Sequence, residues 1–444
     1  MQVSCKKLPS SLSELTALYS LLRGDMALYS SKKTPTRGQF VAGSVAAAVA
    51  AKYATIRVVA APQKEVVVGL NVPLTGSYSD QGQDQLRAYH MAIDEINKGG
   101  GVMGMTIRAV EGDDQTKAPA AVENARRMIE RDGAAMITGG SSTGTAIAVS
   151  GLCQEKGVIF MATLTHGDET TDLNCHRHTF RRYNDAHMSA RSMAKTLLTK
   201  YGTGTWFHIT ADYAWGHSVY DNLTSVLTPA GAKTIKNVLM PLGTTDYSSA
   251  LGQAQAAKPD VLVITEFGKD MINCLNQAAQ FGLTKSTKIL VPLVDEYMAK
   301  GTGDNFDGVV STAPFYWSYH AAKYPAAKKF VDAFKARYGA PPSNGAETAY
   351  VNMYQWKAGL ERAGSLDPKT YIEKMEGYHF QATKGPEYWR AWDHQGINTV
   401  LVVEGVPLAQ RGGDVWAYAK VLEEHPGESV AVSQADSKCK IEAI

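Results

Sequence analysis

Two stretches of small and hydroxyl-bearing residues have the composition of anion-binding loops. The first, Gly139-Gly140-Ser141-Ser142-Thr143, follows an apolar run at 134–138 and precedes a helix-like segment. Glycines let a backbone approach a ligand closely, and hydroxyls beside the free N–H groups of a helix start suit a carboxylate. A nucleotide-binding P-loop would need a lysine that this loop lacks. The stretch predicts either a carboxylate-binding loop, or an ordinary glycine turn whose hydroxyls cap a helix.

The second stretch, Ala162 to Glu169, also follows a strand candidate, at 158–162. Leu164 and Thr165 follow this strand end and are candidate ligand contacts. His166 is expected to donate a hydrogen bond to a ligand carboxylate, the alternative being a surface-loop histidine. His166, Asp168 and Ser141 have the residue types of a hydrolase triad, but we favour hydrogen bonding over catalysis.

Aromatic and acidic residues follow the strand candidates of the second half. Aromatic faces give apolar contact area at low entropic cost, and a tyrosine hydroxyl fixes a ligand's orientation. In the run 315–317, side chains alternate faces, so at least one of three adjacent aromatics is expected to face a cleft. The adjacent acids at 295 and 296 fit either a ligand contact or a solvated loop. The candidate contacts in this half are Tyr213, Trp215, Phe267, Asp295, Glu296 and Tyr316.

These loops need elements that hold them at one edge of a sheet. From Val66 onward, apolar strand candidates alternate with amphipathic helix candidates, which indicates parallel sheets covered on both faces. There are more strands than one sheet usually holds, so we expect two Rossmann-like α/β lobes. The expected strands are 66–72, 105–110, 134–138, 158–162, 205–210, 234–239, 260–265, 288–292, 308–312, 389–393 and 399–404. The expected helices are 81–98, 117–131, 143–156, 187–200, 215–230, 246–256, 268–281, 323–338 and 343–363.

Composition limits the function classes. The 444 residues have a formal net charge of +2, which gives no reason to expect a nucleic-acid partner. The five cysteines lack zinc-site spacing, so we expect neither metal nor cofactor. No apolar run reaches the roughly 20 residues of a membrane-spanning helix. Within residues 1–62, basic residues at 32–37 precede the small and apolar run 40–51, as in a secretory leader. The alternative is a disordered tail on a cytoplasmic protein.

The strings PLTGSYSDQG (73–82), AIDEINKGGGVMG (92–104), TADYAWG (210–216) and PFYW (314–317) resemble one known family. It is the type I periplasmic solute-binding proteins, the branched-chain amino-acid receptors of ABC importers. The resemblance covers 66–425. It implies two lobes joined by a three-segment hinge, with lobe 1 at 66–183 and 316–388, lobe 2 at 184–315 and 389–430, and a tail at 431–444. The crossings are expected near 182–187, 312–318 and 386–392.

The resemblance also implies roles for particular residues. Ser77 and Tyr78, in the loop after the strand candidate 66–72, are expected to line the ligand, as are Leu164 and Thr165 in the loop after 158–162. The loop with Ser141, Ser142 and Thr143 would hold the ligand's carboxylate, and Asp295 or Glu296 would accept its ammonium group. Cysteines at both places in one branch of the family imply a Cys175–Cys439 disulfide, with Cys153 and Cys274 left as buried thiols.

The expected function is therefore capture of a small carboxylate-bearing ligand by hinge closure. The ligand classes left open are an amino acid, an aromatic acid and a keto acid. The expected partner is the membrane permease of an ABC transporter, and we expect an exported periplasmic monomer that is not an enzyme. The alternative is a ligand-sensing receptor or regulator on the same fold.

Overall fold

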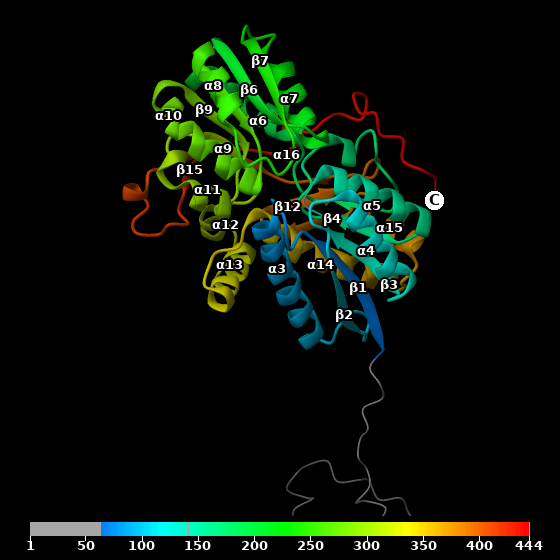
Figure 1. Ribbon diagram of the computed structural model, residues 1–444. Coiled ribbons are helices and arrows are strands. Elements are labelled where there is room, and N and C mark those ends of the chain that lie inside the picture. The colour runs from blue at the N-terminus through cyan, green and yellow to red at the C-terminus, as the bar shows by residue number, and fades with distance from the viewer. Residues whose placement is uncertain (1–63, 141, 444) are drawn as a thin grey trace, which may run out of the picture. The chain divides into compact units, whose positions relative to one another are not determined.

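The computed structural model describes residues 64–140 and 142–443. The predicted leader and Ser141 lie outside the described residues. Two separate parallel sheets form the centres of two α/β lobes (Figure 1), as predicted. No helix of the described residues is long and apolar enough to cross a membrane.

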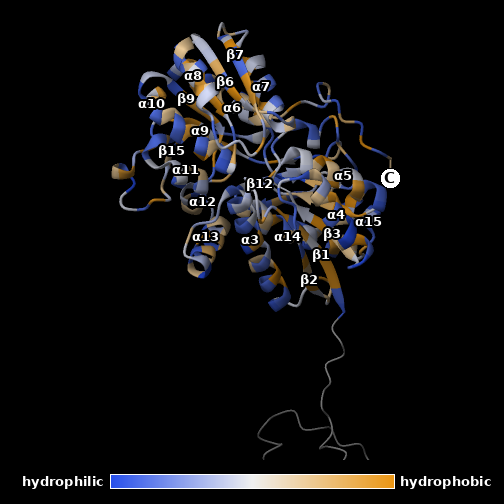
Figure 2. Ribbon diagram, viewed as in Figure 1, coloured by the Kyte–Doolittle hydropathy of each residue, from blue (hydrophilic) through white to orange (hydrophobic). Residues whose placement is uncertain are grey.

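The strand β1 (Glu65–Val72) is apolar along most of its length because both of its faces are buried. Alternate residues of β1 from Val66 to Val72 pack in the core beneath α3 (Ser79–Lys98) and α14 (Asn344–Ala363). Val67 packs in the core beneath α4 (Ala118–Glu130) and α5 (Thr143–Lys156). A strand covered on both faces needs apolar residues at successive positions, which is why β1 is coloured hydrophobic along most of its length (Figure 2). Gly69 also faces the core beneath α4 and α5, where an added Cβ would lie 2.7 Å from the sulfur of Met128.

The first sheet has the order β2-β1-β3-β4-β5, and all its strands are parallel. Its strands are β1 (Glu65–Val72), β2 (Thr106–Asp113), β3 (Ala134–Gly139), β4 (Ile159–Ala162) and β5 (Thr179–Arg181). The helices packed with it are α3 (Ser79–Lys98), α4 (Ala118–Glu130), α5 (Thr143–Lys156), α13 (Pro325–Tyr338), α14 (Asn344–Ala363) and α15 (Pro368–Met375).

The second sheet has the order β15-β14-β10-β9-β8-β6-β7. Its parallel strands are β6 (Thr205–Ala211), β7 (Lys233–Met240), β8 (Val261–Thr265), β9 (Lys288–Leu293) and β10 (Val310–Ala313), and the antiparallel additions are β14 (Val400–Gly405) and β15 (Ala419–His425). Its helices are α6 (Ala186–Tyr201), α7 (Ala214–Leu227), α8 (Ser248–Ala257), α9 (Gly268–Gln280), α10 (Leu283–Ser286), α11 (Glu296–Thr302), α12 (Trp317–Lys323) and α16 (Gly427–Val430).

The two sheets repeat one topology. β7-β6-β8-β9-β10 follows the same order of connection as β2-β1-β3-β4-β5, so each lobe reverses strand order once, between β1 and β3 or between β6 and β8. In open α/β sheets, ligands bind beyond the carboxyl ends of the strands at such a reversal. The loops after β1 and β3, and after β6 and β8, are therefore the positions where each lobe is best suited to hold a ligand.

A third, small sheet lies on the path between the lobes. It contains β11 (His379–Ala382), β12 (Gly385–Trp389) and β13 (Gly396–Ile397). The expected strand at 389–393 is wrong, because β12 ends at Trp389 and the chain turns back through a bond from Arg390 N–H to the Gln395 carbonyl. The exact lobe boundaries remain a prediction.

A buried ion network surrounds Arg182, which lies in the expected first crossing. Arg182 is fully buried and donates to Glu387 from Nε at 2.7 Å, and from Nη1 to Glu347 at 2.7 Å. Burial disfavours the charged form of Glu347, but Arg182 and Lys384 outweigh burial and lower its pKa to about 2. Glu347 lies on α14 and Glu387 on β12, so one guanidinium ties three distant segments together.

The disulfide Cys175–Cys439 is present, with a Cα–Cα distance of 5.6 Å. It fastens the tail that follows α16 to the segment that precedes β5. Glu442 reinforces it by accepting hydrogen bonds from the Arg177 backbone N–H at 2.9 Å and from His176. Cys153 and Cys274 are buried free thiols.

Candidate ligand-binding site

The first loop's hydroxyls are tied into the protein itself. Ser142 is the N-cap of α5, since its Oγ accepts from the Thr145 N–H at 3.2 Å in a capping box. Thr143 Oγ1 accepts from the Gly167 N–H at 3.0 Å, which joins this loop to the one after β4. The first N–H groups of α5 have no acceptor within their own helix and remain suited to an anion. Both predictions for this loop, helix capping and carboxylate binding, are thus compatible with its geometry.

The loop after β4 is equally well bonded. Thr165 Oγ1 lies 3.0 Å from Thr170 Oγ1. His166 Nδ1 accepts from Trp215 Nε1 at 2.8 Å, which leaves Nε2 to donate to Ser189 Oγ at 2.7 Å. Burial lowers the pKa of His166 to about 3, so the ring is neutral. To donate to a ligand, as we predicted, His166 would have to release Ser189.

Residues 140–144 match the G-x-S-x-G spacing of a hydrolase nucleophile, with Ser142 at its centre. A nucleophilic serine needs a base within hydrogen-bonding reach. Ser142 instead bonds Thr145, and both ring nitrogens of His166 bond other partners. Ser142 and His166 therefore do not form a nucleophile–base pair.

The predicted aromatic residues come together across the two lobes. Tyr78 meets Phe267 edge-on at a ring-centroid distance of 5.2 Å, and its hydroxyl lies 2.9 Å from that of Tyr213. Trp215 continues the set, 6.0 Å from Tyr213 and 6.1 Å from Phe267. Leu164 is buried in the same core cluster. These residues contact one another, so part of their surface is committed to joining the lobes.

The two predicted acids differ in what they contact. Asp295 caps α11 by accepting from the Met298 N–H at 2.8 Å, and its other oxygen accepts from Gln81 Nε2 of α3 at 2.9 Å. Glu296 is fully buried, and neither carboxylate oxygen has a hydrogen-bond partner among the described residues. The backbone N–H groups of Glu296 itself and of Asn344 favour its charged form, but neither makes a well-formed hydrogen bond with it. Burial, followed by the charge of Asp295, raises the pKa of Glu296 well above its usual range.

Two tyrosines that the sequence analysis missed lie in the electrostatic field of Glu296. Tyr183 follows β5 and Tyr418 precedes β15, and each is fully buried with a hydroxyl that has no partner among the described residues. Burial raises the pKa of both phenols, and the charge of Glu296 adds to it. The ring of the predicted Tyr316 lies 4.9 Å from that of Tyr418 at a tilted angle of 58°, and its hydroxyl accepts from the Ala419 N–H at 3.4 Å.

A signal for Tyr183 was available, because it lies within the expected first crossing. Tyr418 had none, since it reaches the site only through the pairing of β14 with β15. Burying a polar group without a hydrogen-bond partner costs free energy. The Glu296 carboxyl group and the hydroxyls of Tyr183 and Tyr418 are therefore candidates for hydrogen bonds with a ligand.

A second buried acid lies at the end of β8. Glu266 is 1% exposed, and neither of its oxygens makes a well-formed hydrogen bond among the described residues, although the nearby Tyr247 hydroxyl favours its charged form. Burial and then the charge of Asp270 raise its pKa to about 9. Glu266 also raises the pKa of Tyr78 and Tyr213, which places it beside the aromatic contact between the lobes.

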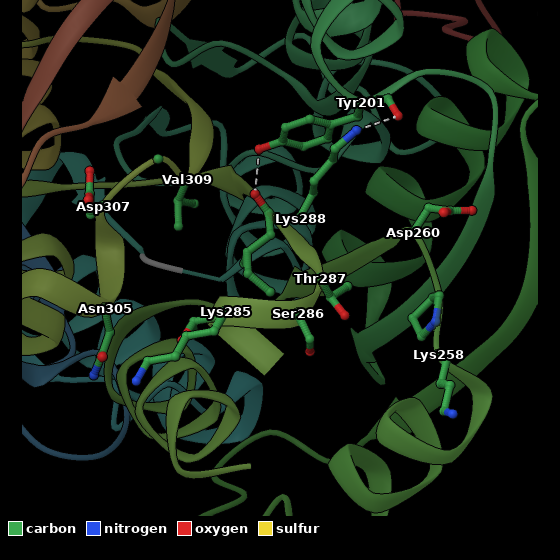
Figure 3. Close-up of a pocket in the computed structure, with 14 residues that line it drawn as sticks. Tyr201, Lys258, Asp260, Lys285, Ser286, Thr287, Lys288, Asn305, Asp307 and Val309 are labelled. Atoms are coloured by element: carbon green, nitrogen blue, oxygen red, sulfur yellow. Dashed lines mark hydrogen bonds between the residues drawn. The ribbon is translucent and has the colours of Figure 1, made fainter. Parts of the chain in front are cut away.

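A cavity of about 510 Å³ lies elsewhere, at the amino ends of β8 and β9 (Figure 3). Its lysines include Lys288, which donates to the Tyr201 carbonyl at 3.1 Å, and the Tyr201 hydroxyl bonds Ile289. This is the edge of the sheet opposite the one where α/β folds place ligands, so we do not assign the ligand site to it. No group of three metal-binding side chains occurs within 64–140 and 142–443.

Comparison with known proteins agrees with this geometry. A family model described as "Periplasmic binding protein" matches residues 65–413. The "Leu/Ile/Val-binding protein homolog 7" of Brucella abortus is 27% identical over 401 residues, covering 87% of this chain and 98% of that protein.

Solved structures give the same result. A periplasmic binding protein from Burkholderia mallei has a TM-score of 0.79 and 27% identity, covering 85% of this chain and 98% of that one. A branched-chain amino acid ABC transporter periplasmic ligand-binding protein from Burkholderia xenovorans has a TM-score of 0.73 and 25% identity, covering 84% and 99%. The chain therefore belongs to the periplasmic binding protein family.

Proposed function

We propose that this protein is the exported receptor of an ABC importer and that it captures a small carboxylate-bearing ligand by closing its two lobes. Membership in the periplasmic binding protein family supports the receptor role. The position of the predicted loops at the strand reversals of both sheets supports the location of the site. Binding of this kind needs desolvation, hydrogen bonding and a hinge equilibrium biased by the ligand.

The observation that carries the ligand class is the unpartnered carboxyl group of Glu296. A buried carboxylate is tolerated when a cation or several donors complete it. An ammonium group has three donors and a positive charge, and the hydroxyls of Tyr183 and Tyr418 lie in the same electrostatic cluster. Among the three ligand classes, this favours an amino acid over an aromatic or keto acid.

The carboxylate end of such a ligand fits the start of α5. The N–H groups of Thr143 and Gly144 belong to the first helical turn, and the helix dipole favours negative charge there. Ser142 and Thr165 flank this position from the loops after β3 and β4. The first lobe would thus hold the acid group and the second lobe the ammonium group.

The same site gives no support for an enzyme, because its serine and histidine are bonded to other groups. We further propose that the leader is removed on export, so that the mature protein begins at a residue somewhere in 52–64. The mature monomer would then dock on a membrane permease. Amino-terminal sequencing of periplasmic protein tests the cleavage. An intact leader on protein recovered from the cytoplasm contradicts export.

The ligand class is tested with matched pairs that differ in one group. Native mass spectrometry of protein purified without denaturation first identifies what co-purifies. Calorimetry then compares L-leucine with 4-methyl-2-oxopentanoate, and L-phenylalanine with phenylpyruvate. We expect binding of an amino acid and at least a hundredfold weaker binding of its keto analogue. Equal binding within a pair would exclude the proposed role of Glu296.

The alternative, a ligand-sensing receptor on the same fold, shares the site but not the partner. It is distinguished by whether loss of the protein abolishes uptake of the identified ligand, or changes only the cell's response to it.

A further inference from the structure

The loop after β1 in the first lobe meets the start of α9 in the second lobe. The backbone N–H of Lys269 donates to the Ser77 carbonyl at 3.1 Å, and its Nζ donates to Ser79 Oγ at 2.7 Å. Between these two bonds, the ring of Tyr78 packs edge-on against Phe267. Both rings are at most 3% exposed, so the contact excludes water.

Gly268 makes this approach possible. Its φ is +58°, a conformation that side chains disfavour. An added Cβ would lie 2.7 Å from the Ser77 carbonyl oxygen and 2.7 Å from Cδ1 of Tyr78. Any larger residue would therefore push the loop away, and the contact depends on glycine for two separate reasons.

All these bonds join one lobe to the other through protein groups alone. They form only when the lobes meet, so each one stabilises the closed state relative to the open state. A receptor that is partly closed before it binds loses less affinity to the conformational change, because apparent affinity scales with the fraction of competent molecules.

We propose that Ser77–Ser79 and Phe267–Lys269 form a latch that holds a fraction of the protein closed without ligand. This goes beyond the proposed function in assigning these residues to lobe closure, although it rests on the hinge motion which that function requires. Ser77, Tyr78 and Phe267, expected from the sequence to touch ligand, act here as contacts between lobes.

The test uses ligand-free protein only. Lobe-to-lobe distance is measured by single-molecule fluorescence transfer between dyes at Glu123→Cys on α4 and Lys236→Cys on β7, two exposed positions in different lobes. Gly268→Ala is compared with Gly252→Ala in α8, where an added Cβ meets its nearest neighbour at an ordinary 4.0 Å. Cys153 and Cys274 are buried and stay unlabelled under native conditions.

We expect Gly268→Ala to raise the open-to-closed ratio about tenfold, as loss of one or two hydrogen bonds predicts, and Gly252→Ala to leave it unchanged. Lys269→Met, which removes only the bond to Ser79, should raise the ratio by a smaller factor. Identical distance distributions for wild type, Gly268→Ala and Lys269→Met would overturn the latch. Because no ligand is added, failure of the proposed ligand class leaves this result untouched.

Discussion

The two sheets share one topology, yet the loops at their carboxyl ends use polar groups in opposite ways. In the first lobe, the hydroxyls of Ser142, Thr143 and Thr165 all bond other protein groups. In the second lobe, Glu266 and Glu296 are buried with no hydrogen-bond partner among the described residues. The hydroxyls of the first edge are bonded without a ligand, whereas these two acids of the second edge are not.

This difference separates stability from binding. A side chain that caps a helix supports both the fold and the shape of the site, so its removal harms both. A buried carboxyl group without a partner costs stability and is retained for what it binds. Substitutions at the two edges should therefore change stability in opposite directions while both weaken binding.

The largest effect is expected for Glu296→Gln. The amide keeps the size of the side chain but removes the negative charge, and loss of one member of a buried charged pair costs roughly 2–5 kcal/mol, or about 30- to several thousandfold in affinity. The thermal midpoint of the ligand-free variant should stay equal or rise, since the unpaired acid is gone. Calorimetry and a thermal melt on the same sample test both parts. A variant that binds like wild type would remove Glu296 from the site.

A smaller effect is expected for Ser142→Ala. Loss of the hydroxyl should weaken binding by roughly 1.5–3 kcal/mol, about ten- to a hundredfold. It should also destabilise the fold by about 0.5–2 kcal/mol, because the cap of α5 is lost. Ser142→Thr is the matched control, as threonine also caps helices. If Ser142→Ala binds normally but melts lower, the hydroxyl serves the helix alone.

Local sequence patterns predicted most of the strands, because a strand with two buried faces is visible as a short apolar run. Each of the strands expected between 66 and 312 overlaps a strand of the structure, since doubly covered strands are continuous apolar runs. β5 was missed because three residues are too short for a periodicity, and β15 because AKVLEEH is largely polar. The capping serine and the strand-end acids could likewise be found from their positions.

What the sequence could not predict depends on contacts between distant segments. Tyr418 reaches Glu296 only after β15 joins the sheet, and Tyr78 finds Tyr213 only when two lobes meet. The absence of a partner for Glu296 is itself a property of the folded surroundings. For that reason the adjacent acids at 295 and 296 looked equivalent in sequence but differ in structure.

Glu266, the other buried acid of the second lobe, allows the effect of an unbonded carboxyl group on stability to be measured through pH. The pKa of Glu266 is raised to about 9 by burial and by Asp270. The folded protein thus holds this proton more tightly than the unfolded chain, so the stability it contributes is full below about pH 4.3 and is lost as pH rises toward 9. Relative to Glu266→Gln, wild type should lose free energy of unfolding steadily between pH 5 and pH 9. Glu123→Gln, at an exposed site, should follow wild type. If the free energies of unfolding of Glu266→Gln and wild type change with pH by the same amount across this range, Glu266 does not have a raised pKa.

The smallest effect should come from Tyr213→Phe, which keeps the ring and removes the hydroxyl that lies 2.9 Å from that of Tyr78. One neutral hydrogen bond contributes about 0.5–1.5 kcal/mol, so affinity for the co-purified compound should fall roughly two- to tenfold. Since this bond joins the lobes, the loss should appear as faster dissociation at an unchanged association rate. Tyr213→Ala also removes the ring that packs on Trp215, and it should weaken binding further. Stopped-flow measurement of both rate constants separates the cases. A loss confined to the association rate would show that Tyr213 acts before closure, on the open second lobe, and would remove it from the contacts that hold the lobes together.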